Sequence, residues 1–397
     1  MPNSFPEPVR LGVVGAGRIA QVAHLPAIVH ASSVELIGVY DPSALLRDGV
    51  ARLYGSTSFP SLHALLDDPR IEAVVITAPD RVHASATLEC LRAGKHVLVE
   101  KPIATSVADA ETVVNAMRDT GLVVQVGAMK RHDPGVRFAA RAARERIGRI
   151  ISATFWYRVM GSLRPSTEAT YFPRMLMDPA VRSTENAHRA NRETYLLATH
   201  GAHIFDTLRN FCGTPSSFMA RHAQVNLDHV WHGMATLDQS GLAHFEIVVD
   251  AHAEWSEGLN IFGEHGSVMV RTPFPVTLQA SYVEVFDEAT GIAERPVFGD
   301  TNPYKLQLDA FAHSVRTGAP TAPDAVDGLE AVRLIEATKL SSDAGGSWIK
   351  MQQLRSLFEV DHRYGSASPR KPIVRRHKLT RLRPQSSVDG SIKTSPS

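Results

Sequence analysis

Short apolar runs alternate with amphipathic stretches through the first third of the chain. The amphipathic stretches predict helices, and the runs between them predict short buried strands. Strands joined through helices pair in parallel and form a doubly wound α/β sheet, whose ligands bind at the carboxyl ends of the strands. The predicted strands are 9–14, 34–40, 73–77, 96–99 and 123–126, and the predicted helices are 18–30, 43–54, 81–93 and 107–120.

The pattern changes after Arg131. Apolar and polar positions alternate in the later segments, and short turns join several of them, which is typical of antiparallel strands. The chain therefore predicts a second, α+β unit with an open, mainly antiparallel sheet. Its predicted strands are 150–158, 217–225, 234–238, 242–250, 259–262, 267–271 and 276–286, and its predicted helices are 135–145, 306–317 and 327–342.

Three parts of the chain are expected: residues 1–130, residues 131–360 and a tail at 361–397. Within the second part, residues 161–192 are polar, rich in proline and without a clear period, so we expect a loop-rich insertion near a bound substrate. An open antiparallel sheet commonly presents one face to a second subunit, which favours a homodimer or homotetramer.

The tail has a distinct composition. It holds nine Lys or Arg residues against two acidic ones, with little apolar periodicity. Such a segment buries too little surface to order itself, so we expect a basic disordered tail. An electrostatic anchor to nucleic acid, membrane or a protein partner is the alternative for this segment.

The whole chain has an ordinary globular composition, with 44% hydrophobic and 21% charged residues. A net charge of +1 gives no general attraction to nucleic acid or membrane, and neither partner is expected. Cys90 and Cys212 lie far apart in predicted helices, which favours buried thiols in a reducing compartment. No apolar run approaches the ~20 residues of a membrane span, and the first residues lack a leader pattern, so we expect a soluble cytoplasmic protein.

A glycine-rich turn, Gly15-x-Gly17-x-x-Ala20, joins the first predicted strand to the first helix. Gly15 permits the tight turn, Gly17 lets the backbone approach a pyrophosphate, and Ala20 keeps helix and strand close. Backbone N–H groups at the helix start, around Arg18 and Ile19, then bind phosphate oxygens. With its strand and helix context, the turn predicts that the first part of the chain is a dinucleotide-binding Rossmann domain.

Asp41 ends the second predicted strand, where a carboxylate can accept both hydroxyls of the adenosine ribose. A negative charge there repels a 2′-phosphate, which favours NAD over NADP. Arg47, a turn or two along the following helix, keeps NADP possible. A turn residue preceding Pro42 is the alternative interpretation of Asp41.

The third predicted strand ends in Thr77-Ala78-Pro79-Asp80, followed by His83. The segment lies over the nucleotide, so Thr77 and Pro79 are expected to line it, and His83 is a further candidate. A histidine on the surface of the following helix is the alternative for His83.

Glu100-Lys101-Pro102 follows the apolar run 97–99 and carries an ammonium group to the carboxyl edge of the same sheet. A cationic side chain beside a nicotinamide can move a proton while a hydride moves. The glycine-rich turn and this tripeptide together therefore predict a dehydrogenase or reductase. A surface ion pair of Glu100 is the alternative.

Four groups of residues follow one another in a distinctive order. They are Ala93-Gly94-Lys95-His96-Val97 with Glu100-Lys101-Pro102, Val126-Gly127 with Lys130-Arg131 and Asp133-Pro134, His200-Gly201-Ala202-His203 with Asp206, and Asp327-Gly328-Leu329-Glu330-Ala331. They resemble motifs of the Gfo/Idh/MocA family of sugar and cyclitol oxidoreductases, named after glucose-fructose oxidoreductase, inositol dehydrogenase and the rhizopine protein. The resemblance extends over roughly residues 9–349.

The resemblance implies roles for three residues. Lys101 would contact the reacting hydroxyl with Glu100 orienting it, and His203 would share that hydroxyl, so Lys101 and His203 are the expected catalytic residues. The family usually carries an aspartate one helical turn before this histidine, where this chain has Thr199. Either His203 alone works with Lys101, or His200 or a group from the insertion replaces the carboxylate. No metal is expected, because no acid or cysteine near the two histidines completes a ligand set.

Substrate contacts are expected from Lys101, Thr199, His200 and His203, and from Lys130 and Arg158 around them. Aromatic rings and bidentate donors suit a polyhydroxylated ring. On that ground further candidates are Arg131, Trp156, Tyr157, Asn191, Arg192 and Tyr195, although residues 155–157 also suit ordinary sheet packing.

The sequence therefore predicts an NAD-dependent oxidoreductase that interconverts a secondary hydroxyl and a ketone on a small sugar, glycoside or cyclitol. An NADP-linked carbonyl or dihydrodiol reductase and a non-catalytic dinucleotide sensor are the alternatives.

Overall fold

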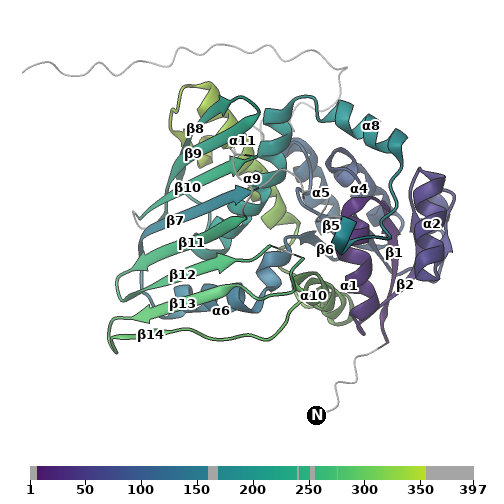
Figure 1. Ribbon diagram of the computed structural model, residues 1–397, viewed down its shortest axis with the longest axis horizontal. Helices are drawn as coiled ribbons and strands as arrows, with labels where there is room; N and C mark the ends of the chain where they lie inside the picture. The colour runs from purple at the N-terminus through teal and green to yellow at the C-terminus, as the bar shows by residue number, and fades with distance from the viewer. Residues whose placement is uncertain (1–6, 160–168, 239–240, 251–254, 275, 355–397) are drawn as a thin grey trace, which may run out of the picture.

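The computed structural model describes residues 7–159, 169–238, 241–250, 255–274 and 276–354. Two β-sheets lie side by side, with helices between them and around the first (Figure 1). The predicted tail at 361–397 and part of the predicted insertion lie outside the described residues.

The first sheet has six strands, all parallel, in the order β3-β2-β1-β4-β5-β6. This is the predicted doubly wound topology. The strand order reverses at β1, which pairs with β2 on one side and β4 on the other, so the crevice for a ligand opens at the carboxyl end of β1. The strands are β1 (Val9–Val14), β2 (Val34–Tyr40), β3 (Thr57–Ser58), β4 (Ala73–Ile76), β5 (His96–Glu100) and β6 (Val124–Gly127).

Helices cover both faces of this sheet, and local signals set their ends. The hydroxyl of Ser43 caps the start of α2 by accepting the N–H of Leu46, and Gly55 ends it at φ +62°. The first predicted helix includes a π-helical turn, η1. The helical segments are η1 (Ala20–His24), α1 (Leu25–His30), α2 (Ala44–Tyr54), α3 (Leu62–Leu66), η2 (Asp80–Val82), α4 (His83–Arg92), α5 (Val107–Thr120) and η3 (Met129–His132).

The second sheet is mixed and mainly antiparallel, as predicted. Its order is β14-β13-β12-β11-β7-β10-β9-β8-β15, and only β7 and β10 pair in parallel among the described strands. The strands are β7 (Ile150–Val159), β8 (Ser217–Val225), β9 (Asp228–Thr236), β10 (Leu242–Val249), β11 (Ser256–Gly263), β12 (Gly266–Thr272), β13 (Tyr282–Asp287), β14 (Ile292–Glu294) and β15 (Ile349–Lys350).

One face of the second sheet is packed and the other is open. Inward residues of β7 such as Phe155 and Tyr157 alternate with outward ones such as Arg158. Helices α6 (Pro134–Glu145), α9 (Arg192–Cys212) and α11 (Ala325–Asp343) pack on the inward side, behind the sheet in Figure 1. Among the described residues, no helix covers the outward face.

The two closing helices also pack on the first unit. Leu308 and Phe311 of α10 (Pro303–Thr317) join the core that contains Leu11 of β1. Leu329 and Val332 of α11 join the core beneath α5. Because Leu334 and Ala337 of α11 belong to the core of the second sheet, α11 joins the two units, whereas α10 packs on the first.

Several predicted segments differ from the structure. The strand predicted at 276–286 is shorter and occupies Tyr282–Asp287 in β13. Residues 161–192, predicted as loop, contain helix α8 (Pro179–His188), which Asp178 caps at its start. The strand predicted at 234–238 is the end of a longer strand, β9, whose inward positions include His229 and Gly233. These two residues break the apolar alternation on which the prediction depends.

Candidate active site

The glycine-rich turn lies at the carboxyl end of β1. Gly15 has φ +97°, and its N–H donates to the carbonyl of Tyr40 at 2.8 Å. A Cβ on Gly15 would lie 2.6 Å from the backbone nitrogen of Ala78, so only glycine permits this approach. A Cβ on Gly17 would meet no described atom within 4 Å. The open space beside Gly17 fits a dinucleotide pyrophosphate, which binds against the backbone at this position.

Asp41 directly follows β2 beside this turn. Its Oδ2 accepts the N–H of Ala16 and its Oδ1 accepts the N–H of Ser43, both at 2.8 Å. Burial raises the pKa of Asp41, although both hydrogen bonds oppose that shift. The carboxylate thus sits between the glycine-rich turn and the start of α2, where an adenosine ribose binds in Rossmann domains.

His83 joins two turns of the first sheet. Its Nδ1 lies 2.7 Å from the carbonyl oxygen of Pro102, and its Nε2 lies 2.7 Å from that of Ala78. Both ring nitrogens face backbone, so His83 positions the turns after β4 and β5 and presents neither nitrogen to a ligand. Nearby, the hydroxyl of Thr77 donates to the carbonyl of Gly15 at 2.6 Å.

Three other predicted nucleotide residues lie around these turns. Arg18 is exposed at the start of the first helix, Ile19 packs partly buried against the core, and Pro79 precedes η2. Backbone geometry, more than side chains, therefore defines this half of the site.

Glu100 ends β5 and is buried beneath the turn that carries Lys101. Its Oε1 lies 2.7 Å from Nε2 of His24, and its Oε2 accepts the N–H of Lys101 at 3.1 Å. Burial alone raises the pKa of Glu100, but the His24 hydrogen bond and the charge of Lys101 outweigh it and lower the pKa below its usual value. Glu100 is therefore an ionised anchor for the lysine turn.

Helix α9 brings two histidines to this lysine. Nζ of Lys101 donates to the carbonyl oxygen of Thr199 at 3.4 Å, one turn before His203. Burial lowers the pKa of His200 to about 3 and that of His203 well below its ordinary value, and the charges of Lys101 and Lys130 add to both shifts. Both histidines are therefore neutral at pH 7, so each ring has one unprotonated nitrogen that can accept a hydrogen bond.

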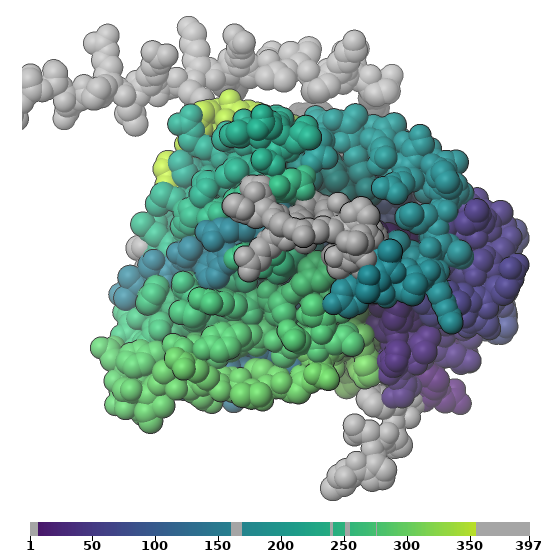
Figure 2. Space-filling view, in the orientation of Figure 1, coloured from purple at the N-terminus to yellow at the C-terminus, as the bar shows by residue number. Residues whose placement is uncertain are grey.

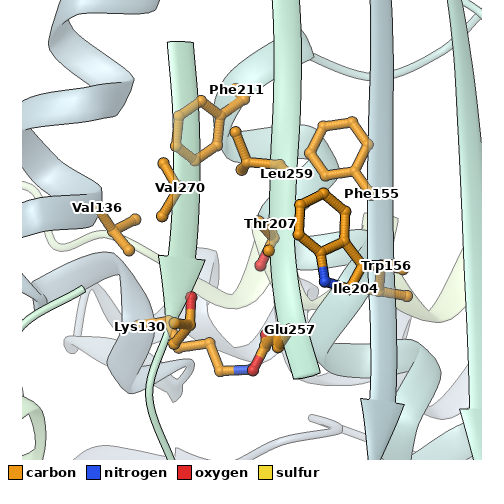
Figure 3. A pocket seen from close by; sticks show the side chains of 12 residues that line it. Lys130, Val136, Phe155, Trp156, Ile204, Thr207, Phe211, Glu257, Leu259 and Val270 are labelled. Carbon is orange, nitrogen blue, oxygen red and sulfur yellow. The ribbon is translucent and has the colours of Figure 1, made fainter. Parts of the chain in front are cut away.

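Tyr157 of β7 connects His203 to a second lysine. The two rings stack with centroids 5.4 Å apart and planes 15° from parallel. On the same ring, Nζ of Lys130 lies 4.6 Å from the centroid, a cation–π contact. Lys130 also pairs with Glu257, and Figure 3 shows the two side chains meeting at one end of a pocket lined mainly by apolar groups.

Glu257 is the buried carboxylate nearest to this stack on the second sheet. It lies directly across from Tyr157 in the β7–β11 register. Its Oε1 accepts from Lys130, whereas its Oε2 has no hydrogen-bond partner among the described residues. Burial raises the pKa of Glu257 and lowers that of Lys130. The charge of each residue opposes this effect by stabilising the charged form of the other. An open, buried acceptor of this kind is suited to a substrate hydroxyl.

Several predicted substrate residues are not brought to this cluster. Arg158 lies on the outward face of the second sheet and binds Glu246 through two hydrogen bonds of 2.6 and 2.9 Å, because alternate strand residues face opposite sides. Arg131 is held by Asp206 and Asp327 at the junction of the two units. Two others lie elsewhere, since Asn191 caps α9 and Arg192 pairs with Asp250. Trp156 borders the pocket that contains Lys130 and Glu257, and Tyr195 lies under Arg189 with its hydroxyl beside the side chain of Thr199.

Two residues of the site were absent from the sequence predictions. His24 is a polar residue within an otherwise apolar helical stretch, and Glu257 is an acidic residue in alternation with Leu259 and Ile261. The predicted strand began at Leu259, two positions too late to include the acid. A polar residue at an inward position was the available signal in both cases.

No group of three or more His, Cys, Asp or Glu side chains is arranged to hold a metal ion in the described part of the chain. Within the same residues, no helix has both the length and the apolar character to cross a membrane.

Comparison with known proteins identifies the family of this chain. Residues 9–128 match the Gfo/Idh/MocA oxidoreductase family model with an NAD-binding Rossmann fold, and residues 191–351 match that family's C-terminal alpha/beta domain. Inositol 2-dehydrogenase 2 of Saccharopolyspora erythraea is 28% identical over 348 residues, 85% of this chain and 94% of the relative. The scyllo-inositol 2-dehydrogenase (NADP(+)) of Bacillus subtilis is 25% identical over 361 residues, 84% of this chain and 94% of the relative.

The fold is also that of a solved sugar dehydrogenase. Levoglucosan dehydrogenase in complex with NADH and levoglucosan superimposes with a TM-score of 0.69 at 19% sequence identity. The similarity covers 86% of this chain and 99% of that one. At this level of identity, it shows the common fold.

Proposed function

The chain belongs to the Gfo/Idh/MocA family of oxidoreductases, and from that premise we propose that it is an NAD-dependent dehydrogenase of a polyhydroxylated substrate. The reaction interconverts a secondary hydroxyl and a ketone on a sugar, glycoside or cyclitol. Relatives named as inositol dehydrogenases support this class of substrate. The observation that carries the proposal is the contact of Lys101, from the Rossmann domain, with the turn of α9 that bears His203.

Lys101 and His203 move the proton of the reacting hydroxyl. The neutral His203 accepts that proton, while the ammonium of Lys101 stabilises the developing negative charge on the oxygen. Bound NAD supplies the hydride acceptor. Tyr157 holds the His203 ring in place by stacking on it, and the Glu100 anchor holds the turn of Lys101.

Glu257 replaces the carboxylate that Thr199 does not provide. It reaches the site from β11 instead of α9, paired with Lys130 and across from Tyr157. Its open Oε2 accepts the hydroxyl next to the reacting one, and Lys130 offsets the charge of the buried acid. Substrates with two neighbouring hydroxyls therefore suit this site better than simple alcohols.

The outward face of the second sheet is the proposed contact between copies of the chain. Exposed side chains on it include Met234, Phe262, Tyr282 and Phe286. Apolar residues on an otherwise uncovered antiparallel sheet are typical of an interface. Light scattering after size exclusion should give a dimer or tetramer, and a monomer would contradict this assignment.

Incubation with NAD or NADP and a panel of sugars, glycosides and inositols tests the function, with the absorbance of reduced nicotinamide as the readout. Oxidation of a polyol with NAD supports the proposal. Turnover restricted to NADP and carbonyl substrates would support the reductase alternative. Dinucleotide binding with no turnover across the panel in either direction would support the sensor.

A further inference from the structure

A segment of the second unit crosses the carboxyl edge of the Rossmann domain. This crossing segment, residues 172–188, is joined to the glycine-rich region by two hydrogen bonds between Gln21 and Leu176, of 2.8 and 2.9 Å. Farther along, Arg81 forms a 2.6 Å ion pair with Glu185 on α8. In Figure 2 the teal surface of this region lies against the purple surface of the N-terminal elements. The crossing segment thus borders the nucleotide side of the site.

Asp178 of the crossing segment places a second carboxylate beside Asp41. Its Oδ2 accepts the hydroxyl of Ser43 at 2.6 Å, and its Oδ1 accepts the N–H of Ala180 at 2.9 Å. The N–H of Ser43 donates in turn to Oδ1 of Asp41 at 2.8 Å. A single serine therefore links two acidic side chains, one from each unit of the protein.

This arrangement bears on the choice between NAD and NADP. In Rossmann domains the 2′-phosphate of NADP binds beside the acidic position that ends the second strand, here Asp41. Hydroxyl and N–H groups at the start of the next helix are the donors a phosphate uses. Here the hydroxyl of Ser43 already binds a carboxylate, which carries the same sign of charge as a phosphate.

Arg47, a cation close to Asp41, already has hydrogen-bond partners. Nε of Arg47 on α2 donates to Asp48 at 3.0 Å, and its guanidinium also reaches the carbonyl of Asp41 at 3.4 Å. In addition to burial, the charge of Asp178 contributes to the raised pKa of Asp41, as expected for two neighbouring carboxylates. An incoming 2′-phosphate would therefore lie near the carboxylates of Asp41 and Asp178 and near Arg47, whose charge Asp48 partly neutralises.

We propose that Asp178, together with Asp41, selects NAD against NADP. The inference rests on the proposed dehydrogenase function and adds a selectivity residue outside the Rossmann domain. Docking of the crossing segment, and not the Rossmann domain alone, then sets the dinucleotide preference.

Equilibrium titration of the full-length protein with NAD and NADP tests the inference without any substrate. Asp178→Asn keeps the size of the side chain and one acceptor oxygen for the N–H of Ala180, replaces the other acceptor with an NH2 group, and removes the charge. The ratio of the NADP to the NAD dissociation constant should fall about tenfold, as expected for loss of one charge near a phosphate dianion. The NAD dissociation constant itself should change less than about twofold. In the wild-type protein, 1 M salt should also lower this ratio, because it screens the repulsion between the carboxylates and the 2′-phosphate.

Matched variants separate this effect from loss of structure. Glu193→Gln removes a carboxylate at the start of α9, outside the crossing segment and paired with His222, and should leave the ratio unchanged, whereas Asp41→Ala should lower it. Asp178→Ser retains a capping side chain for α8 and serves if the Asn variant folds poorly. An unchanged ratio in the folded Asp178 variants would overturn the inference, as would a wild-type protein that prefers NADP or binds neither dinucleotide. If NAD selectivity behaves as expected but no polyol is oxidised, the proposed reaction fails and this inference stands.

Discussion

His24 and Glu100 meet at 2.7 Å in the interior of the Rossmann domain, between the first helix and the end of β5. The His24 ring is fully buried and packs edge-on against Tyr304. Because Glu100 also accepts the N–H of Lys101, the position of the proposed catalytic lysine depends on a histidine from a distant part of the chain.

His24→Ala should therefore reduce both stability and turnover. The substitution removes a buried hydrogen-bond partner of an ionised Glu100 and should cost roughly 1–3 kcal/mol in the free energy of unfolding. Urea denaturation measures this cost, and steady-state kinetics on the folded variant measures the effect on Lys101. His30→Ala, an exposed histidine at the end of the same helix, is the control and should leave both unchanged. Wild-type kinetics in His24→Ala would show that the pair is only structural.

Lys101→Ala should retain dinucleotide binding and lose most turnover. The dinucleotide is proposed to bind at the Gly15 turn, whereas Lys101 acts on the substrate. Acid–base groups typically contribute about 10²- to 10⁴-fold in rate, so kcat should fall by about 10²-fold or more. NAD titration and kinetics on the identified substrate check both parts. Full activity would exclude the proposed mechanism and favour the sensor.

The two histidines of α9 should differ in their importance. His203→Ala should lower kcat in the same range as the lysine variant, because it removes the proposed proton acceptor. His200→Ala should leave kcat within a few fold if Glu257 supplies the missing carboxylate. A large loss of kcat with a shifted pH profile in His200→Ala would instead show that His200 takes that role.

Glu257→Gln should weaken the proposed second hydroxyl contact. The variant keeps the shape of the side chain and removes its charge, so kcat/KM for a vicinal diol should fall about 10- to 100-fold, with less effect on a substrate that lacks the second hydroxyl. The control is Glu246→Gln, which alters a carboxylate paired with Arg158 on the outward face of the same sheet. Equal losses for both kinds of substrate would argue against a contact with the second hydroxyl.

Stability should fall with acid partly through His132. Burial, followed by the nearby charges of Arg137 and Arg131, lowers the pKa of His132 to about 4. Between pH 6.5 and 4 the unfolded chain binds a proton at this histidine that the folded protein does not, so folding stability is lost as the pH falls. At pH 5 the loss is about 2 kcal/mol.

His132→Gln should reduce the difference in unfolding free energy between pH 7 and pH 5 by that amount, whereas His313→Gln at an exposed position of α10 should not. An identical pH dependence in His132→Gln and wild type would contradict the assignment.

Local patterns were sufficient to predict five of the six strands of the first sheet and its turn; the two-residue edge strand β3 was not predicted. The strands β1, β4 and β5 are apolar runs bounded by polar residues, and parallel pairing places their carboxyl ends at one edge. Glycine at positions 15 and 17 acts over a few residues of backbone, so its role can be inferred without the rest of the fold. Lys101 directly follows β5, so the prediction of that strand also places the lysine at this edge.

Strand packing decided which of two adjacent residues faces the site. Tyr157 and Arg158 were both predicted to contact substrate, yet neighbouring residues of a strand point to opposite faces. The inward face of β7 carries Phe155 and Tyr157, whereas Arg158 faces outward with Glu246. A slip of one residue reverses this assignment, and only the contacts of the whole sheet exclude it.

The sequence by itself determined the Rossmann sheet, the glycine-rich turn and the position of the lysine, because each depends on neighbouring residues. Tertiary structure alone decided which side chains surround them. The pairs His24–Glu100, Lys130–Glu257 and Ser43–Asp178 each join distant segments. Buried polar groups require partners, but their choice depends on how helices and sheets pack, which the periodicity of a single segment does not encode.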